Sequence, residues 1–215
     1  MTSALVRLLS AASGLALVLF LLAHLVGISL APLAPARFET YAAALHQAAW
    51  LAPLELALAG VAVTHLALAL RRAVIDARAR ADLAGPIRSR RREPGAALAG
   101  FAARLMPWSG ALLLVFLVVH LSQLRWPRPA GGQELQRLLA VLQQPPSLLL
   151  TSLAGLAVGL HLLQGLESAH RSLGLLDPAN GGRIRWLGRS LALLMGGGFA
   201  LLPFVLRLGA GAATR

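Results

Sequence analysis

SGLALVLFLLAHL (Ser13–Leu25) and SGALLLVFLVVHL (Ser109–Leu121) are two similar apolar stretches that lie 96 residues apart in the chain. Both begin with Ser-Gly, carry a phenylalanine at the same place and end in His-Leu. Nearly every residue between the glycine and the histidine is aliphatic. Such a run is typical of a helix in lipid, so the sequence buries a histidine twice at matching positions.

The rest of the chain is similarly apolar. Hydrophobic residues make up 57% of the 215 residues, and the mean hydropathy is +0.70. Apolar runs of about 18 or more residues indicate transmembrane helices. Five such runs are present, at Gly14–Leu30, Leu51–Leu70, Met106–Leu124, Leu148–Leu166 and Leu187–Leu206. We therefore predict an all-α integral membrane protein, a single transmembrane domain over residues 1–215 whose first four helices form a bundle.

Positive charge indicates the orientation of these helices. The formal net charge is +12, and every basic residue is an arginine. The arginines lie between the apolar runs, so we expect a membrane topology signal and no nucleic-acid partner. With the N-terminus in the cytoplasm, fourteen arginines fall on the inner side and six on the outer side. This bias predicts an Arg-rich cytoplasmic loop over residues 71–104 and an outside C-terminus.

Three further features narrow the interpretation. The chain has no cysteine, which excludes disulfides, iron–sulfur ligation by this chain and covalent haem attachment. The first apolar run is long and lacks a clear cleavage site, which favours a membrane span over a signal peptide. The two outer loops are broken by prolines and have room for short interfacial helices over Phe38–Ala48 and Gln133–Leu142.

Each of the first four spans carries one histidine. An ionisable side chain in hydrocarbon is costly unless it has a partner. At about 1.5 Å per residue, His24 and His120 lie roughly 25 Å from the inner edge of the membrane, and His65 and His161 roughly 10 Å from it. The histidines therefore form two pairs, separated by roughly 15 Å along the membrane normal.

Two facing imidazoles can hold a haem iron from both sides, and an interior of Leu, Ala and Gly suits a flat apolar ring. We predict two haem b groups, with His24 and His120 as axial ligands of the outer haem and His65 and His161 of the inner haem. Zinc sites and proton relays usually contain carboxylates. The spans contain few acids, and these lie near helix ends: Glu55 and Glu167.

Polar and small residues accompany the histidines. Ser13-Gly14 and Ser109-Gly110 stand about three helical turns before His24 and His120, where small residues allow helices and a porphyrin to approach closely. We also expect three polar side chains close to the histidines to offer hydrogen bonds: Thr64, Ser122 and Gln164.

Several stretches resemble the membrane cytochrome b subunit of succinate dehydrogenase/fumarate reductase, of the single-chain type with five helices and two haems. AASGLALVLFLLAHLVG resembles its first helix, FETYAAALH the segment after that helix, and MPWSGALLLVFLVVHL its third helix. GLHLLQGLESAHRSLGLLDPA resembles the fourth helix and its exit, and is the most diagnostic stretch. The likeness covers nearly the whole chain and is weakest in the Arg-rich loop and the C-terminal tail.

The resemblance implies the same ligand pairs, with His24 and His120 at the distal haem and His65 and His161 at the proximal haem. It implies a lipid-embedded anchor in a bacterial inner membrane that binds a flavoprotein subunit and an iron–sulfur subunit at the cytoplasmic face. Electrons would pass between the succinate/fumarate couple and a membrane quinone, menaquinone being usual for this type. The chain would not itself act on succinate.

The resemblance also suggests further site residues. A quinone site is expected near the outer haem, where Glu55, with help from His46, could pass protons; an ordinary interface anchor is the alternative for Glu55. Ser10 falls where relatives often have a polar residue near a propionate or quinone. Two inner-side residues could touch a propionate or a docked subunit, or form a solvated cluster: His170 and Arg171.

The sequence departs from some relatives at two positions: Pro107 and Gly159 stand where those relatives have an arginine and an acid. A proton route that uses that acid is therefore in doubt. Two other functions stay open. One is a haem-free membrane anchor or small transporter whose histidines pack or relay protons. The other is a different four-helix haem protein, such as a stand-alone ferric or ascorbate-linked reductase, for which the fifth helix has no evident reason.

Overall fold

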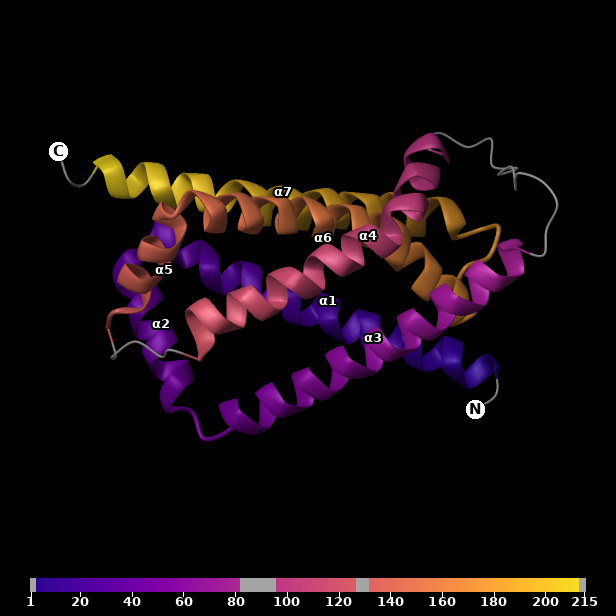
Figure 1. Cartoon of the computed structure of the whole chain (residues 1–215), viewed down its shortest axis with the longest axis horizontal. Helices are drawn as coiled ribbons and strands as arrows, with labels where there is room; N and C mark the ends of the chain where they lie inside the picture. The colour runs from indigo at the N-terminus through magenta and orange to yellow at the C-terminus, as the bar shows by residue number, and fades with distance from the viewer. Residues whose placement is uncertain (1–2, 82–95, 127–131, 213–215) are drawn as a thin grey trace.

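The computed structural model describes residues 3–81, 96–126 and 132–212, and these residues are almost entirely helical. Five long helices are apolar enough to cross a membrane (Figure 1). They are α1 (Ser3–Leu33), α3 (Leu51–Ala81), α4 (Ala96–His120), α6 (Pro145–Ser172) and α7 (Gly181–Ala212). The predicted all-α membrane fold with five spans is confirmed.

Two short helices connect the long ones at one end of the molecule (Figure 1). They are α2 (Pro35–Gln47) and α5 (Glu134–Gln143), close to the short helices expected from the sequence. Proline stands in the first turn of α2 and of α6, where its missing N–H costs no helical hydrogen bond. We call this end of the molecule the α2/α5 end.

The long helices extend past the predicted spans. α3 continues through Arg71 and Arg72 to Ala81, and α4 begins at Ala96. The predicted loop over residues 71–104 is therefore too long, and residues 82–95 of it lie outside the described residues. Alanine and arginine are both good helix formers. Hydropathy thus locates the point where a helix leaves lipid, whereas the helix itself continues.

The elements repeat with the same 96-residue offset as the two quoted stretches. The order long, short, long is formed by α1, α2 and α3, and again by α4, α5 and α6. In the second repeat, a single π-helical turn, η1 (Leu121–Arg125), continues α4 directly after His120. α7 comes after the second repeat as an added helix.

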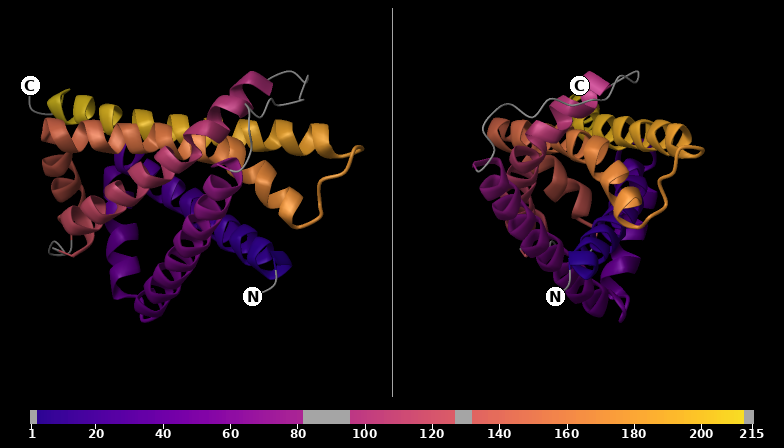
Figure 2. Two further views of the ribbon diagram at one scale, coloured as in Figure 1. Left: turned by 45° about the vertical axis from the view of Figure 1, so that its right-hand side comes forward. Right: turned by 90° about the vertical axis from the view of Figure 1, so that its right-hand side faces the viewer.

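The four helices that carry histidines form a ring (Figure 2, right). α1 packs against α3, α4 packs against α6, and α1 packs against α6 between the repeats. Among the described residues, α3 and α4 are not a closely packed pair, so the ring has an open seam there. In their most apolar windows only 6% of the residues of α3 and of α4 are buried, against 39% in α6 and 33% in α7.

α7 lies along α6 at very close range. A Cβ atom added to Gly155 would overlap the backbone nitrogen of Ala200, and one added to Gly196 would lie 2.7 Å from the Cα atom of Gly159. Met195, next to these residues, is fully buried. Lipid is as apolar as leucine, so membrane helices associate mainly where small residues let backbones approach. These glycines fix α7 against the second repeat.

The exit from α6 forms a defined turn. Gly174 has a φ of +71°, and the N–H of Leu175 donates to the carbonyl of His170 at 2.9 Å, a glycine-based helix ending. Asp177 Oδ1 then accepts from the backbone N–H of Asn180 at 2.8 Å, just before α7. The stretch that is most diagnostic of the family resemblance thus has a structural purpose: it turns the chain back along α6.

Candidate cofactor site

The structure brings the four membrane histidines together as two pairs. The ring centroids of His24 on α1 and His120 on α4 lie 6.0 Å apart, with an interplanar angle of 87°. Those of His65 on α3 and His161 on α6 lie 6.3 Å apart, at 69°. Each pair joins two helices that stand diagonally across the ring, so the imidazoles meet in its interior.

These separations suit two imidazoles that share one metal ion. A metal–imidazole bond is about 2 Å long and the nitrogen lies about 1.2 Å from the ring centroid, so the two centroids would be roughly 6.4 Å apart. Two nitrogen donors on opposite sides leave the plane between them to other ligands. A planar macrocycle with four nitrogen donors fits this donor set.

Each pair combines one histidine from each repeat. His24 and His120 are equivalent residues of the repeats, and so are His65 and His161. Ser13 contacts His65 and therefore marks the level of the second pair on α1, eleven residues before His24. At about 1.5 Å per residue, the two pairs are roughly 16 Å apart along the helices.

A serine hydroxyl contacts each histidine of the second pair. Ser13 Oγ lies 3.3 Å from Nδ1 of His65, and Ser109 Oγ lies 3.2 Å from Nδ1 of His161. Both hydroxyls are also bonded to the carbonyl three residues earlier on their own helix. These carbonyl bonds measure 3.2 Å to Ser10 and 3.0 Å to Met106.

The carbonyl bonds favour one assignment of the ring proton. A hydroxyl has one proton to donate, and a carbonyl oxygen can only accept. With that proton on the carbonyl, each serine oxygen accepts from Nδ1–H of its histidine. Nε2 is then the nitrogen with a free lone pair, the one that can bind a metal.

The glycines after these serines allow the histidines to lie close to the backbone. A Cβ atom on Gly14 would lie 3.2 Å from Cε1 of His65, and one on Gly110 would lie 3.6 Å from Cε1 of His161. Along the sequence, each Ser-Gly motif stands about three turns before the histidine of its own helix. The structure places it against the histidine of the neighbouring helix, 52 residues from the serine in both repeats.

Aromatic side chains surround the first pair. Phe20 stacks on His24 with centroids 5.6 Å apart, and its repeat equivalent Phe116 lies 5.1 Å from His120. Phe199 of α7 also stacks on His24, at 6.0 Å. Sequence reasoning missed these phenylalanines, although two of them recur at the 96-residue offset. The two pairs therefore have different neighbours, aromatic rings for one and hydroxyls for the other.

Two expected hydrogen-bond donors point elsewhere. Thr64 Oγ1 donates to the carbonyl of Gly60 at 2.8 Å, and Ser122 Oγ donates to the carbonyl of Val119 at 2.7 Å. Both hydroxyls thus bond to their own helix, which is the usual arrangement for a serine or threonine inside a membrane helix.

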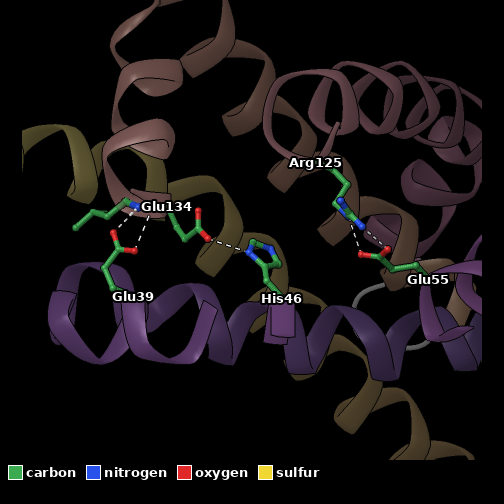
Figure 3. A network of polar contacts seen from close by, with 6 residues as sticks. Glu39, His46, Glu55, Arg125 and Glu134 are labelled. Carbon is green, nitrogen blue, oxygen red and sulfur yellow. Dashed lines mark hydrogen bonds and ion pairs between the residues drawn. The ribbon is translucent and has the colours of Figure 1, made fainter. Parts of the chain in front are cut away.

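Polar residues of the two repeats meet at the α2/α5 end (Figure 3). Arg125 of η1 forms a two-pronged ion pair with Glu55 of α3, in which Nε donates to Oε1 at 2.6 Å and the terminal nitrogen donates to Oε2. His46 of α2 has its Nδ1 atom 2.8 Å from Oε1 of the buried Glu134, close enough for an ion pair but not an aligned hydrogen bond. The predicted quinone residues Glu55 and His46 lie at this end, in separate pairs.

Glu39 completes this group of contacts. Its carboxylate accepts from the backbone N–H groups of Glu134 at 3.2 Å and Leu135 at 2.8 Å, at the start of α5. A carboxylate at a helix N-terminus satisfies unpaired N–H groups and opposes the positive end of the helix dipole. Sequence alone did not reveal this cap, because Glu39 and α5 belong to different repeats.

The predicted propionate residues occupy local contacts. The Ser10 carbonyl accepts from Ser13, at the level of His65. His170 has Nδ1 2.8 Å from the carbonyl of Leu166, and Arg171 pairs with the buried Glu167 at 2.7 Å. The last two contacts lie within the final turns of α6, so His170 and Arg171 both have partners on their own helix.

The geometry defines a class of protein: a multi-pass membrane protein that holds two pairs of facing histidines between two helical repeats. The chain matches no protein-family profile, and it shows no significant similarity to curated proteins or to solved structures. The resemblance to the succinate dehydrogenase/fumarate reductase cytochrome b therefore stays a prediction. The function proposed for the chain depends on the histidines and their neighbours.

Proposed function

We propose that this chain is a two-haem membrane cytochrome b, the anchor and electron-transfer subunit of a succinate:quinone oxidoreductase. The observation that carries the proposal is the pairing of the histidines, with ring centroids 6.0 Å and 6.3 Å apart across the helical ring. Two pairs, each with one histidine from each repeat, would hold two haem irons.

His24 and His120 would hold one haem b, and His65 and His161 the second. When bound, haem supplies one-electron transfer through its iron. The chain's own part is to present the ligand nitrogens, to keep water from the iron, and to hold the two sites in line at roughly 16 Å. An apolar helical ring with small residues near its histidines is suited to these tasks.

The distribution of arginines supports an orientation of the two pairs relative to the two sides of the membrane. The arginine bias favours an N-terminus in the cytoplasm of a bacterial inner membrane and a C-terminus outside. His24 and His120 would then lie toward the outside, nearer the α2/α5 end. By the resemblance, flavoprotein and iron–sulfur subunits would dock at the opposite, cytoplasmic end. The quinone, menaquinone in relatives, would react near the α2/α5 end.

Haem content tests the proposal directly. We expect the purified full-length chain to show the reduced spectrum of low-spin haem b, with two haems per chain by a pyridine haemochrome assay. His65→Ala or His161→Ala should remove one haem, and His24→Ala or His120→Ala the other, because each iron loses an axial ligand. Each double variant within one pair should still hold one haem.

Two other histidines provide matched controls. His46→Ala and His170→Ala change the same residue type outside the two histidine pairs, and both should keep two haems. A wild-type chain that binds no haem when haem is supplied would favour the haem-free anchor. Two haems without co-purifying flavoprotein and iron–sulfur subunits from the native membrane would favour a stand-alone reductase.

A further inference from the structure

The Nδ1 atoms of the second histidine pair face buried hydroxyls. Ser13 and Ser109 are 8% and 5% exposed, so little water competes for their bonds to His65 and His161. The contacts of the first pair are instead aromatic, from Phe20, Phe116 and Phe199. The two pairs are otherwise similar, but hydroxyls contact the imidazoles of one pair and aromatic rings contact those of the other.

We propose that Ser13 and Ser109 are positioning residues that hold His65 and His161 with Nε2 toward a shared iron and set its reduction potential. This inference rests on the proposed two-haem function and adds residues to it. Each serine is itself fixed, because its proton goes to the carbonyl three residues earlier. The hydroxyl oxygen therefore accepts from Nδ1–H and fixes both the tautomer and the rotation of the imidazole.

The physical effect on an iron has a defined sign. A hydrogen bond that Nδ1–H donates makes the imidazole a stronger electron donor through Nε2. A stronger donor stabilises oxidised iron more than reduced iron, which lowers the reduction potential. The surroundings of the bond exclude water, so little water competes for it. Loss of either serine hydroxyl should therefore raise the potential at this site and weaken retention of the haem.

The experiment compares Ser13→Ala, Ser109→Ala and the double variant with the wild-type chain in redox titrations. We expect the midpoint of the haem at His65 and His161 to move upward, with a larger shift in the double variant, and the other midpoint to stay unchanged. The His65→Ala spectrum identifies which haem is which. Retention of the same haem should fall about 10- to 100-fold, the usual effect of losing such an outer contact.

Matched controls exist on the same two helices. Ser29 on α1 bonds the carbonyl of Leu25 at 2.6 Å, and Ser122, just after α4, bonds that of Val119 at 2.7 Å. Ser29→Ala and Ser122→Ala remove a local bond of the same kind without removing a histidine contact. Both controls should leave both midpoints in place.

The outcomes separate this inference from the function on which it rests. Unchanged midpoints and haem retention in Ser13→Ala and Ser109→Ala overturn it, even with two haems bound. If the alanine variants lose both haems, Ser13→Thr and Ser109→Thr test whether the hydroxyl is responsible. Threonine keeps the hydroxyl, so these variants should restore haem binding if the hydroxyl positions the histidine. A haem-free wild type contradicts the proposed function instead. In that case, nitrogen NMR of the haem-free chain tests the serine contact through the tautomer of His65. A ring protonated at Nδ1 whose signal changes in Ser13→Ala supports the contact. A ring protonated at Nε2 contradicts it.

Discussion

Phe199 gives the added helix α7 a direct part in the candidate site. Its ring stacks on His24 at 6.0 Å with an interplanar angle of 26°, on a histidine that Phe20 already flanks. Such stacking restricts the rotation of the His24 imidazole. α7, which is not part of either repeat, thus distinguishes the His24/His120 pair from the other pair.

Phe199→Ala should weaken haem retention at His24 and His120 by about 2- to 10-fold, because a stacked aromatic pair contributes about 0.5–1.5 kcal/mol beyond its buried area. The haem at His65 and His161 should be unaffected. Phe204→Ala, which removes an exposed ring from the same helix, is the control. Transfer of haem to an acceptor apoprotein measures the retention. Equal rates for the two variants would show that Phe199 has no special role.

At the residue scale, the sequence predicted which histidines pair, but not which other side chains contact them. Membrane depth can be obtained by counting residues along a helix, so the pairing of His24 with His120 could be derived. The Ser13 contact with His65 depends on which faces of two helices meet. In a span that is apolar on every side, hydrophobic periodicity does not identify that face. The constant separation of 52 residues between serine and histidine was the one available signal.

Among the elements, η1 has a clear consequence for the site. It begins directly after His120, whereas the chain after His24 continues as regular α-helix. A π-turn inserts an extra residue and rotates the residues beyond it about the helix axis. Arg125, at its end, thereby meets Glu55 of α3, a contact that a regular continuation of α4 would direct elsewhere. Hydropathy predicted the span but gave no sign of this turn.

The contact between α6 and α7 is the element-scale feature most sensitive to a single methyl group. Gly155→Ala should lower the thermal stability of the detergent-solubilised chain by several degrees, since overpacking at a backbone contact costs about 1–3 kcal/mol. Gly197→Ala adds the same methyl group to α7 at a position where the new Cβ would have no neighbouring atom within 4 Å. It should be neutral or slightly stabilising. Similar melting temperatures for the two variants would contradict the packing.

The whole molecule is two repeats joined in two different ways. Apolar side chains of α1 and α6 meet in one core, which includes Val18 and Val158. At the α2/α5 end the joints are polar: Glu39 caps α5, and Arg125 bridges to Glu55. The second joint spans the seam where α3 and α4 are not closely packed. The sequence showed two matching stretches but not this seam, because no local pattern encodes which helices are neighbours.

Arg125→Ala should therefore loosen the repeats without unfolding either one. The ion pair is 29% and 33% exposed at its two side chains, so its contribution is about 1 kcal/mol, the upper part of the range for exposed pairs. That corresponds to roughly 2–4 °C in melting temperature for a chain of this size. Both proposed haem sites lie between the repeats, so both haems should be released at a lower temperature than in the wild type.

Arg171→Ala provides the comparison, because Arg171 pairs with Glu167 inside a single helix. Arg171→Ala should change the temperature of haem release by less than about a degree, which is less than the change expected when a contact between the repeats is lost. Arg125→Lys keeps the charge but not the two-pronged geometry, and should fall between wild type and Arg125→Ala. If Arg125→Ala and Arg171→Ala release haem at the same temperature, the seam is held by other contacts and the bridge between repeats has no mechanical role.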